Sequence, residues 1–304
     1  FLNFEKKDES ELTLLFKGNY KKNKGYNISS INLRDESNIF ELNNVILDKN
    51  FKIFSINTAN FNYLDRNTEK NILSLKKKSN DYKITGKQLN AIKLIDDLLF
   101  ENSKEKNNYF SKNFNLIINI DNVLIGKNQF LNNLKGKLEF KNNEVTNAKI
   151  ISEFNAEDKL VFTIESNDGK KITTFFSDRA KPFVKKFKFI KGFDEGSLDF
   201  YSVKSDGISN SKIKIYNFKL KELPILTKIL TLASLQGIAD ILSGEGIRFN
   251  ELEMNIENKK NLMVINEIYA IGPAISILMD GYIEREKLIS LRGTLVPATT
   301  LNKV

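Results

Sequence analysis

Apolar and polar residues alternate over short runs along most of the chain, and Gly, Asn and Asp separate the runs. In the clearest run, Phe114 to Ile125, every second residue from Phe114 to Ile120 is aromatic or aliphatic, and most residues between them are polar. Alternation with a period of two is typical of a β-strand that buries one face. Because such runs recur at roughly ten-residue spacing, the pattern predicts an all-β meander.

Helical spacing of apolar residues occurs at three places, Leu89 to Phe100, Arg179 to Lys186 and Leu223 to Leu242. Ser177 or Asp178 could cap the second helix. The third is the longest apolar segment, and a Ser-Gly pair of the kind that ends helices follows it. The sequence therefore predicts a mainly β fold, an elongated, twisted, mostly antiparallel sheet with about three short α-helices.

Polar segments indicate loops and a boundary between domains. Asp65 to Asn80 is polar and predicts a loop, and Tyr82 to Gly86 predicts a strand that ends at the glycine. Glu101 to Asn108 is a charged, Asn-rich segment. We predict two regions, residues 1–108, an N-terminal β-meander that ends in a helix, and residues 109–304, a C-terminal β region.

The composition excludes several kinds of chemistry, because the 304 residues contain no Cys and no His. Disulfides, thiolate metal sites, Ser-His-Asp catalysis and Cys-His catalysis are thereby excluded. The pairs Asp96–Asp97 and Glu251–Glu253 fall on expected solvent faces. The segment from Ser243 to Gly246 follows a helix and lacks the Gly-Lys-Ser/Thr of a phosphate loop. We expect no enzyme, no catalytic residue, no metal and no cofactor.

A net charge of +9 is typical of proteins that bind an anionic partner such as nucleic acid or an anionic membrane. Lysine as a solvated surface residue, encoded by an AT-rich genome, is the simpler interpretation. Aromatic residues alternate with lysines from Phe183 to Phe189 and could stack on single-stranded nucleic acid. A helix followed by a strand explains the same segment more economically, and we expect no nucleic-acid partner.

The stretch from Lys219 to Leu301 carries a set of motifs in a fixed order: Leu-Pro, an apolar helix, Ser-Leu-Gln-Gly-Ile, Ser-Gly-x-Gly-Ile-x-Phe, Ile-Gly-Pro-Ala and Gly-Thr-Leu-Val-Pro-Ala. In its order and spacing this stretch resembles the AsmA-like C-terminal region of large bacterial envelope proteins of the YhdP and TamB type. The matching positions are Leu223, Pro224, Ser234, Leu235, Gln236, Gly237, Ile238, Ser243, Gly244, Gly246, Ile247, Phe249, Gly272, Pro273, Ala274, Gly293, Thr294, Leu295, Val296, Pro297 and Ala298.

The resemblance implies a long β-groove that holds phospholipid acyl chains and moves lipid between the inner and outer bacterial membranes. It implies a periplasmic location, an inner-membrane anchor in a part of the chain outside these residues, and a role in outer-membrane biogenesis. The family has no catalytic signature. Because the sequence begins with Phe1 and not Met, we expect a fragment of a longer protein. Envelope protein partners are left unidentified.

Alternation alone leaves two interpretations of the apolar side of the strands. It could pack on a second sheet or on the helices as a filled core, which fits a structural or assembly scaffold of the bacterial envelope. It could also stay open as a groove that binds lipid, because three short helices are few for covering so many strands. The candidate groove-lining residues are Phe114, Leu116, Ile118, Ile120, Leu138, Phe140, Leu160, Phe162, Ile164, Leu198, Phe200, Ile213 and Ile215.

Overall fold

The computed structural model describes residues 4–5, 11–22, 25–99, 110–184, 192–221, 246–259, 262–284 and 288–297. These residues form seventeen strands and two short helices, which confirms the mainly β prediction. The chain divides into two compact units, Phe1–Glu157 and Asp158–Val304, which are described separately below. The boundary predicted near residue 108 lies inside the first unit.

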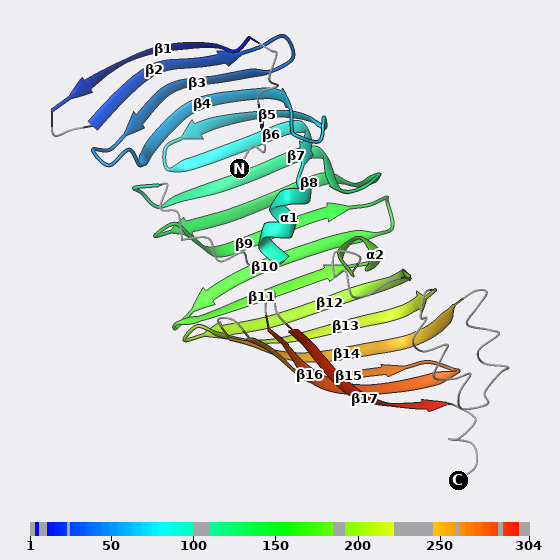
Figure 1. The fold of residues 1–304 in the computed structure, drawn as a ribbon. Helices are drawn as coiled ribbons and strands as arrows, with labels where there is room; N and C mark the ends of the chain where they lie inside the picture. The colour runs from blue at the N-terminus through cyan, green and yellow to red at the C-terminus, as the bar shows by residue number, and fades with distance from the viewer. Residues whose placement is uncertain are drawn as a thin grey trace. The chain divides into compact units, whose positions relative to one another are not determined.

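The first unit contains nine strands, and each pairs with the next along the chain (Figure 1). All of these pairings are antiparallel except that of β6 with β7, which is parallel. A parallel pair needs a crossover connection, and helix α1 (Ile92–Leu99) lies in that connection. The strands are β1 (Thr13–Lys21), β2 (Gly25–Arg34), β3 (Ile39–Leu47), β4 (Ile53–Leu64), β5 (Lys70–Lys78), β6 (Asp81–Asn90), β7 (Phe114–Gly126), β8 (Gln129–Lys141) and β9 (Glu144–Glu153).

A buried polar network fixes the junction between β6 and α1. The Asn90 side-chain oxygen accepts a hydrogen bond from the Ile92 backbone N–H (3.0 Å), as an N-cap residue does. Its amide nitrogen donates to Asp65 (2.6 Å), and its backbone N–H donates to the side-chain oxygen of Asn71 (2.8 Å). Asp65 and Asn71 are both buried, so their polar groups are satisfied inside the protein and not by water.

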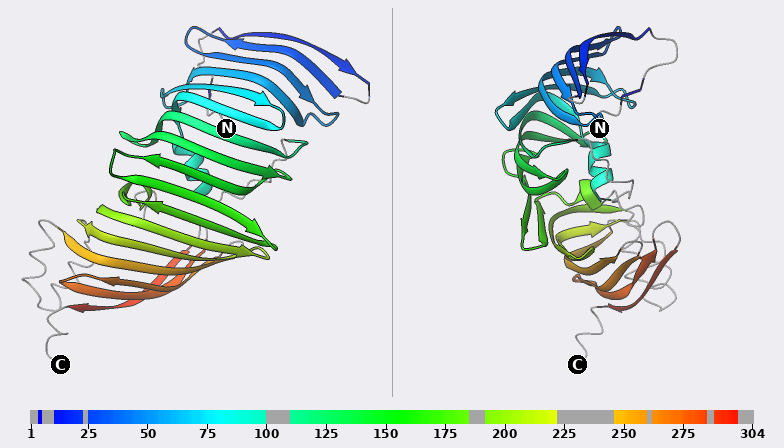
Figure 2. Two further views of the ribbon diagram at one scale, coloured as in Figure 1. Left: turned by 180° about the vertical axis from the view of Figure 1, so that it is seen from behind. Right: turned by 90° about the vertical axis from the view of Figure 1, so that its left-hand side faces the viewer.

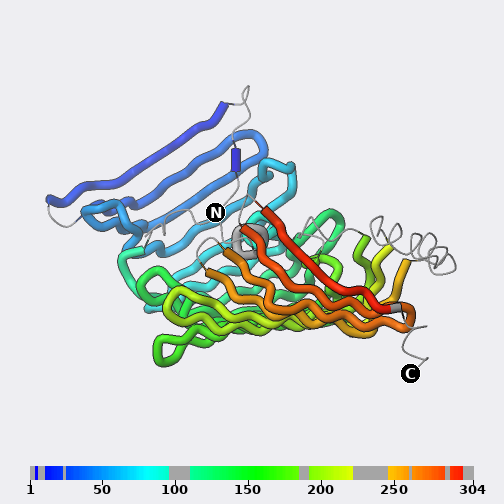
Figure 3. The backbone as a smooth tube through the Cα atoms, turned by 60° about the horizontal axis from the view of Figure 1, so that its bottom comes forward, coloured from blue at the N-terminus to red at the C-terminus, as the bar shows by residue number. Residues whose placement is uncertain are grey.

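The second unit contains eight strands that follow one another as an antiparallel meander, which Figures 2 and 3 show from other directions. The last four strands, β14 to β17, agree with the predicted all-β meander, because each pairs antiparallel with the next. Of the helix predicted over Arg179 to Lys186, the described part is α2 (Lys181–Val184). The helix predicted over Leu223 to Leu242 lies outside the described residues. The strands are β10 (Lys159–Asn167), β11 (Lys170–Ser177), β12 (Phe193–Ser205), β13 (Ile208–Leu220), β14 (Ile247–Lys259), β15 (Leu262–Ile271), β16 (Ile275–Glu284) and β17 (Leu288–Pro297).

The predicted loop over Asp65 to Asn80 is wrong, because strand β5 runs through it. Leu73 and Leu75 alternate with Ser74 and Lys76, but the three lysines that end the strand make the segment as a whole polar. The strand that begins at Tyr82 also continues past Gly86 to Asn90. A Cβ atom at Gly86 would lie 2.6 Å from the Ile72 carbonyl oxygen, so this glycine permits a close approach of two strands and does not end one.

Three phenylalanine rings form the best-buried cluster of the second unit. Phe193, Phe218 and Phe249 lie on β12, β13 and β14, and consecutive rings stack with centroids 5.3 and 5.2 Å apart. Left-handed backbone at Asn217 (φ 51°) interrupts the alternation of β13, so that Phe218 and Ile215 are both buried although they are three residues apart. Asparagine tolerates this conformation better than most residues.

We expect Phe249→Ala to lower the free energy of unfolding by about 3–5 kcal/mol, because the substitution leaves a cavity in a close-packed ring cluster. Phe249 is 0% exposed, whereas Phe176 on β11 is 37% exposed. Phe176→Ala is therefore the matched control, with an expected loss of about 1 kcal/mol. Urea denaturation followed by circular dichroism measures both. Equal losses in the two variants would contradict the assignment of the ring cluster as the core.

Candidate functional site

Residues that pair across neighbouring strands point to the same face of a sheet, so the pairing register defines rows of side chains that cross the strands. In the second unit, one row crosses all eight strands from β10 to β17. Every member is aromatic, aliphatic, Met or Gly: Phe162, Phe175, Phe200, Ile213, Met254, Ile268, Met279 and Gly293. We call the face that carries this row the row face of the unit.

A second row of the second unit lies two residues from the first row on each strand. Because side chains alternate between faces, it lies on the same face as the first row. It contains one hydroxyl group among apolar residues: Leu160, Ser177, Leu198, Ile215, Leu252, Ala270, Ile277 and Leu295. The row between these two points to the opposite face and is mixed: Val161, Phe176, Asp199, Lys214, Glu253, Tyr269, Leu278 and Thr294. The charged residues of this middle row, Asp199, Lys214 and Glu253, thus lie on the opposite face.

The first unit shows the same separation over nine strands. One row of its row face reads Phe16, Ile31, Leu42, Ala59, Leu75, Ile84, Ile118, Gly136 and Ile150. The adjacent row of the same face reads Leu14, Leu33, Phe40, Phe61, Leu73, Gly86, Ile120 and Leu134. The row between them is polar except at its two ends: Leu15, Asn32, Glu41, Asn60, Ser74, Thr85, Asn119, Lys135 and Ile151.

The structure places the thirteen sequence-predicted lining residues on the row faces of their own units. Phe114, Leu116, Ile118, Ile120, Leu138 and Phe140 lie on β7 and β8 of the first unit, where Phe114 stacks on Phe140 with centroids 4.6 Å apart. Leu160, Phe162, Ile164, Leu198, Phe200, Ile213 and Ile215 lie on β10, β12 and β13 of the second unit. Their two groups belong to different units, so they line two faces that are considered separately.

The burial of these thirteen residues is uneven. Five are buried: Ile120, Leu160, Ile164, Leu198 and Ile215. The other eight are half-buried. In the second unit, the row that begins at Phe162 stays half-buried over its first five strands, and the ring of Phe183 from α2 packs against Phe175 with centroids 4.7 Å apart. The row face therefore keeps apolar surface in contact with solvent in the middle of the sheet.

Sequence reasoning missed the members of the rows on β1 to β6, on β9, on β11 and on β14 to β17. Met254, Ile268 and Met279 continue the row of Phe162, and each sits in a run that alternates. The signal that could have found them was this alternation. Strand pairing decides which alternating positions of separate strands share one row, and a single strand does not reveal its pairing.

The opposite face of the second unit carries a ladder of ion pairs. Glu253 contacts Lys212 (2.6 Å) and Lys214 (3.0 Å), and Lys214 also contacts Glu251 (3.3 Å). Hydrogen bonds from these two lysines lower the pKa of Glu253 to about 2. Both carboxylates of the predicted pair Glu251–Glu253 are thus engaged by lysines, as in a structural ion pair. The side chains of Asp96 and Asp97 lie outside the described part.

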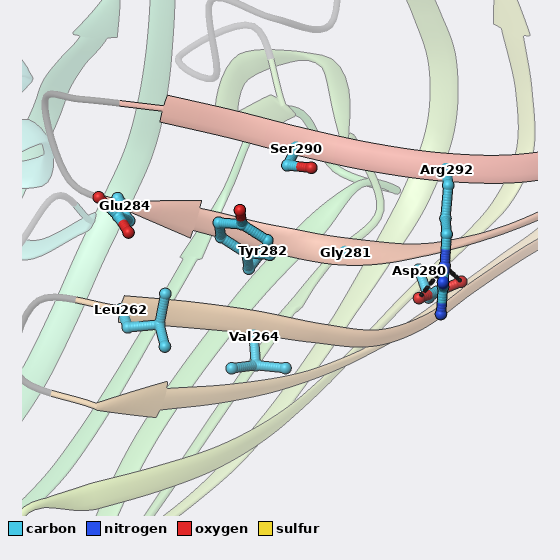
Figure 4. A pocket seen from close by; sticks show the side chains of 8 residues that line it. All are labelled: Leu262, Val264, Asp280, Gly281, Tyr282, Glu284, Ser290 and Arg292. Atoms are coloured by element: carbon cyan, nitrogen blue, oxygen red, sulfur yellow. Dashed lines mark hydrogen bonds and ion pairs between the residues drawn. The ribbon is translucent and has the colours of Figure 1, made fainter.

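A hollow of about 590 Å³ lies on β15 to β17 of the second unit and contains none of the sequence-predicted residues (Figure 4). Leu262, Val264 and Tyr282 give it an apolar wall, and Arg292 beside it pairs with Asp280 at 3.0 Å. In the first unit, a second hollow of about 420 Å³ includes Asn60, Ser74, Thr85 and Asn119 from the polar row.

Comparison with known protein families, curated proteins and solved structures found no match to the chain. Within the described ranges, no group of three or more acidic side chains is placed to hold a metal ion. Neither described helix is long and apolar enough to cross a membrane. The candidate functional site of each unit is therefore its row face.

We expect the Glu253 ion pairs to make stability depend on pH in the acid range. The pKa of Glu253 falls from 4.5 to about 2 on folding, so its contribution is present above pH 4.5 and is lost as the pH falls towards 2. Glu253→Gln should cost about 1 kcal/mol at pH 7, since the pair is partly exposed. The same substitution should cost little near pH 2, where most of this contribution is lost.

Urea denaturation at a series of pH values measures this dependence. Glu165→Gln, which removes an exposed carboxylate of β10, is the control and should cost little at any pH. A Glu253→Gln penalty that stays constant from pH 7 to pH 2 would show that the ion pairs do not carry it.

Proposed function

We propose that the row face of each unit is an open apolar groove that binds phospholipid acyl chains, and that the protein is a non-catalytic segment of a bridge-like lipid carrier. The carrier would move phospholipid between the inner and outer membranes of a bacterial envelope. The observation that carries the proposal is the unbroken apolar row from Phe162 to Gly293, with Asp199, Lys214 and Glu253 on the opposite face of the same strands.

The length of the row fits an acyl chain. Neighbouring strands lie about 4.8 Å apart, so a row that crosses eight strands extends for roughly 34 Å along the sheet. One leaflet of a bilayer has a hydrocarbon thickness of about 15 Å, half of the usual 30 Å core. A single row therefore offers more length than one extended acyl chain requires. A lipid could shift along the row without leaving apolar surroundings.

The energetics favour binding without any specific contact. Moving a CH₂ group from water to an apolar surface is favourable by about 0.8 kcal/mol, so a 16-carbon chain gains on the order of 12 kcal/mol if it is fully buried. The half-buried members of the row, such as Phe175, Phe200 and Met254, leave apolar area for such a chain to cover. Head groups would stay in water at the open edge of the face.

This mechanism uses no catalytic group. It is therefore compatible with a chain that contains no His and no Cys. The resemblance of residues 219–301 to the AsmA-like C-terminal region supports the same assignment. That resemblance is also the basis for placing the protein in the periplasm, anchored to the inner membrane through a part of the chain not included here.

A second candidate function, a structural or assembly scaffold of the bacterial envelope with a filled core, is favoured by one observation. Leu198 and Ile215 lie side by side on the row face and are both buried. A face that is closed over its whole area would bury such residues and leave no space for lipid. The two candidate functions differ in whether the purified protein carries phospholipid.

We expect Phe162→Glu to remain folded and to lose most of its co-purifying phospholipid, because a charge on an open wall can reach water but interrupts the acyl track. Thr163→Glu is the matched control, since it places the same charge at the next residue of β10, on the opposite face. Organic extraction of the purified 304-residue chain, followed by mass spectrometry, measures bound lipid. Circular dichroism verifies the fold.

Three outcomes separate the candidates. Loss of lipid in folded Phe162→Glu, with normal lipid in Thr163→Glu, supports the groove. If the wild-type chain carries no lipid and Phe162→Glu fails to fold, the scaffold is favoured, because a charge trapped in a closed core costs several kcal/mol. A folded Phe162→Glu variant with the wild-type amount of lipid rejects this row as the lipid track.

The same test applies independently to the first unit. Ile118 is half-buried on the row face of β7, and its neighbour Asn119 is exposed on the opposite face. We expect Ile118→Glu to reduce bound phospholipid and Asn119→Glu to leave it unchanged, with both variants folded. Lipid extraction from the two proteins in parallel gives the comparison. Equal lipid content in Ile118→Glu and Asn119→Glu would exclude the first unit from the track.

A further inference from the structure

Six charged side chains gather where β12 begins, β13 ends and β14 begins, at one end of the second unit's strands. The register brings Asp194, Lys219 and Arg248 together, because Asp194 pairs with Lys219 and Lys219 pairs with Arg248. We call the whole set the rim cluster, which consists of Lys181, Asp194, Glu195, Lys219, Lys221 and Arg248.

Four cations share two carboxylates in the rim cluster. Asp194 accepts hydrogen bonds from Lys181 and from Lys221, the latter at 2.5 Å. These two bonds hold the pKa of the Asp194 carboxyl well below its usual range, so the group is ionised at neutral pH. The second carboxylate has its own two partners: Glu195 contacts Lys219 at 3.4 Å and Arg248 at 3.0 Å.

The cluster therefore carries two positive charges in excess. The ladder of ion pairs in the middle of β13 and β14 has no excess charge, because its two cations, Lys212 and Lys214, face two carboxylates, Glu251 and Glu253. All four rim cations are at least partly exposed, from 23% for Lys219 to 51% for Lys221. Cations in excess at an accessible position attract anions from solution.

The rim cluster lies at the end of the row face. Phe193, Leu220 and Ile247, at the same strand ends, pair with one another on neighbouring strands, and Phe193 and Ile247 are buried. Lys181 belongs to α2, the helix whose Phe183 packs on Phe175 of the apolar row. Asp194, Lys219 and Arg248 come one residue along the strands from these three residues and so point to the opposite face. The strand ends are where the charged face and the apolar face meet, an arrangement that matches a ligand with an anionic group and an apolar part.

We propose that the rim cluster binds the phosphate group of an anionic ligand, and that the ligand is a phospholipid whose acyl chains lie on the row face. Only the identification of the ligand as a phospholipid rests on the proposed lipid-binding function. Binding of the phosphate group depends only on the charges of the rim cluster, so the cluster should also bind free phosphate.

The donor inventory supports phosphate binding. An ammonium group has three N–H donors and a guanidinium has five. Lys221 and Arg248 each use one donor on a carboxylate in the described structure, which leaves further N–H groups for phosphate oxygens. Hydrogen bonds between such cations and phosphate are charge-assisted and stronger than neutral ones. Because the site is exposed to solvent, its affinity should fall as the salt concentration rises.

The double variant Lys219→Gln/Lys221→Gln tests the proposal. It removes the two excess charges and leaves each carboxylate one partner, Lys181 for Asp194 and Arg248 for Glu195. The matched control, Lys170→Gln/Lys212→Gln, lowers the net charge of +9 by the same two units away from the rim. The probes are inorganic phosphate and dihexanoylphosphatidylglycerol below its micellar concentration, titrated against the 304-residue chain at low salt by calorimetry.

We expect the rim variant to bind both probes about tenfold more weakly than wild type, since loss of one hydrogen bond to a charged group corresponds to roughly that factor. The control should stay within about twofold. Equal affinity of wild type and rim variant, or equal weakening in the control, overturns the proposal. If the double variant does not fold, Lys221→Gln alone, at the most exposed lysine of the cluster, supplies the comparison.

The two probes distinguish this inference from the proposed function. Rim-dependent binding of inorganic phosphate, with no binding of the lipid probe and no lipid on extraction, supports the phosphate site and rejects the lipid carrier. Extracted phospholipid together with unchanged affinities in the rim variant supports the lipid carrier and rejects the rim site. Rim-dependent binding of both probes supports both.

Discussion

The structure depends on the hydrogen-bonded register between neighbouring strands, because side chains alternate between faces with a period of two. A slip of one residue in β13 would bring Lys212 and Lys214 to the row face in place of Ile213 and Ile215. Lys214 would then take the buried position of Ile215, and an unpaired buried charge costs several kcal/mol, a large share of the stability of a domain. The same register that stabilises the fold therefore also keeps each row apolar across every strand of its unit.

The register is maintained even where the strands are irregular. Left-handed backbone at Asn217 and at Gly196 occurs at positions that face each other on β13 and β12, so the alternation is interrupted on both strands at the same level. Phe193 and Leu198 on β12, and Phe218 and Ile215 on β13, can then all be buried. Irregularity of one strand is compensated by its neighbour, and the stacked rings of Phe193, Phe218 and Phe249 occupy the space that results.

The charged residues of β13 and β14 occupy defined positions in the second unit, as the apolar residues do. Lysines and glutamates on the opposite face neutralise one another in the middle of β13 and β14, and the excess of cations lies at the strand ends. A face that binds acyl chains would need no single irreplaceable residue. Specificity in such a protein would come from where charges lie at the edge of an apolar surface.

The sequence by itself determined the mainly β class and the strand over Phe114 to Ile125, because alternation is local and survives in a single strand. For the same reason, the thirteen candidate residues lie on the row faces of their own units. It failed at β5, where Lys76, Lys77 and Lys78 concealed the alternation of Leu73 and Leu75. Only the tertiary structure decided that Phe162, Phe200 and Met279 share one row and that Lys181 of α2 meets Asp194 of β12. The reason is physical: rows and ion-pair clusters join residues far apart in the sequence, and strand pairing, which local patterns do not specify, brings them together.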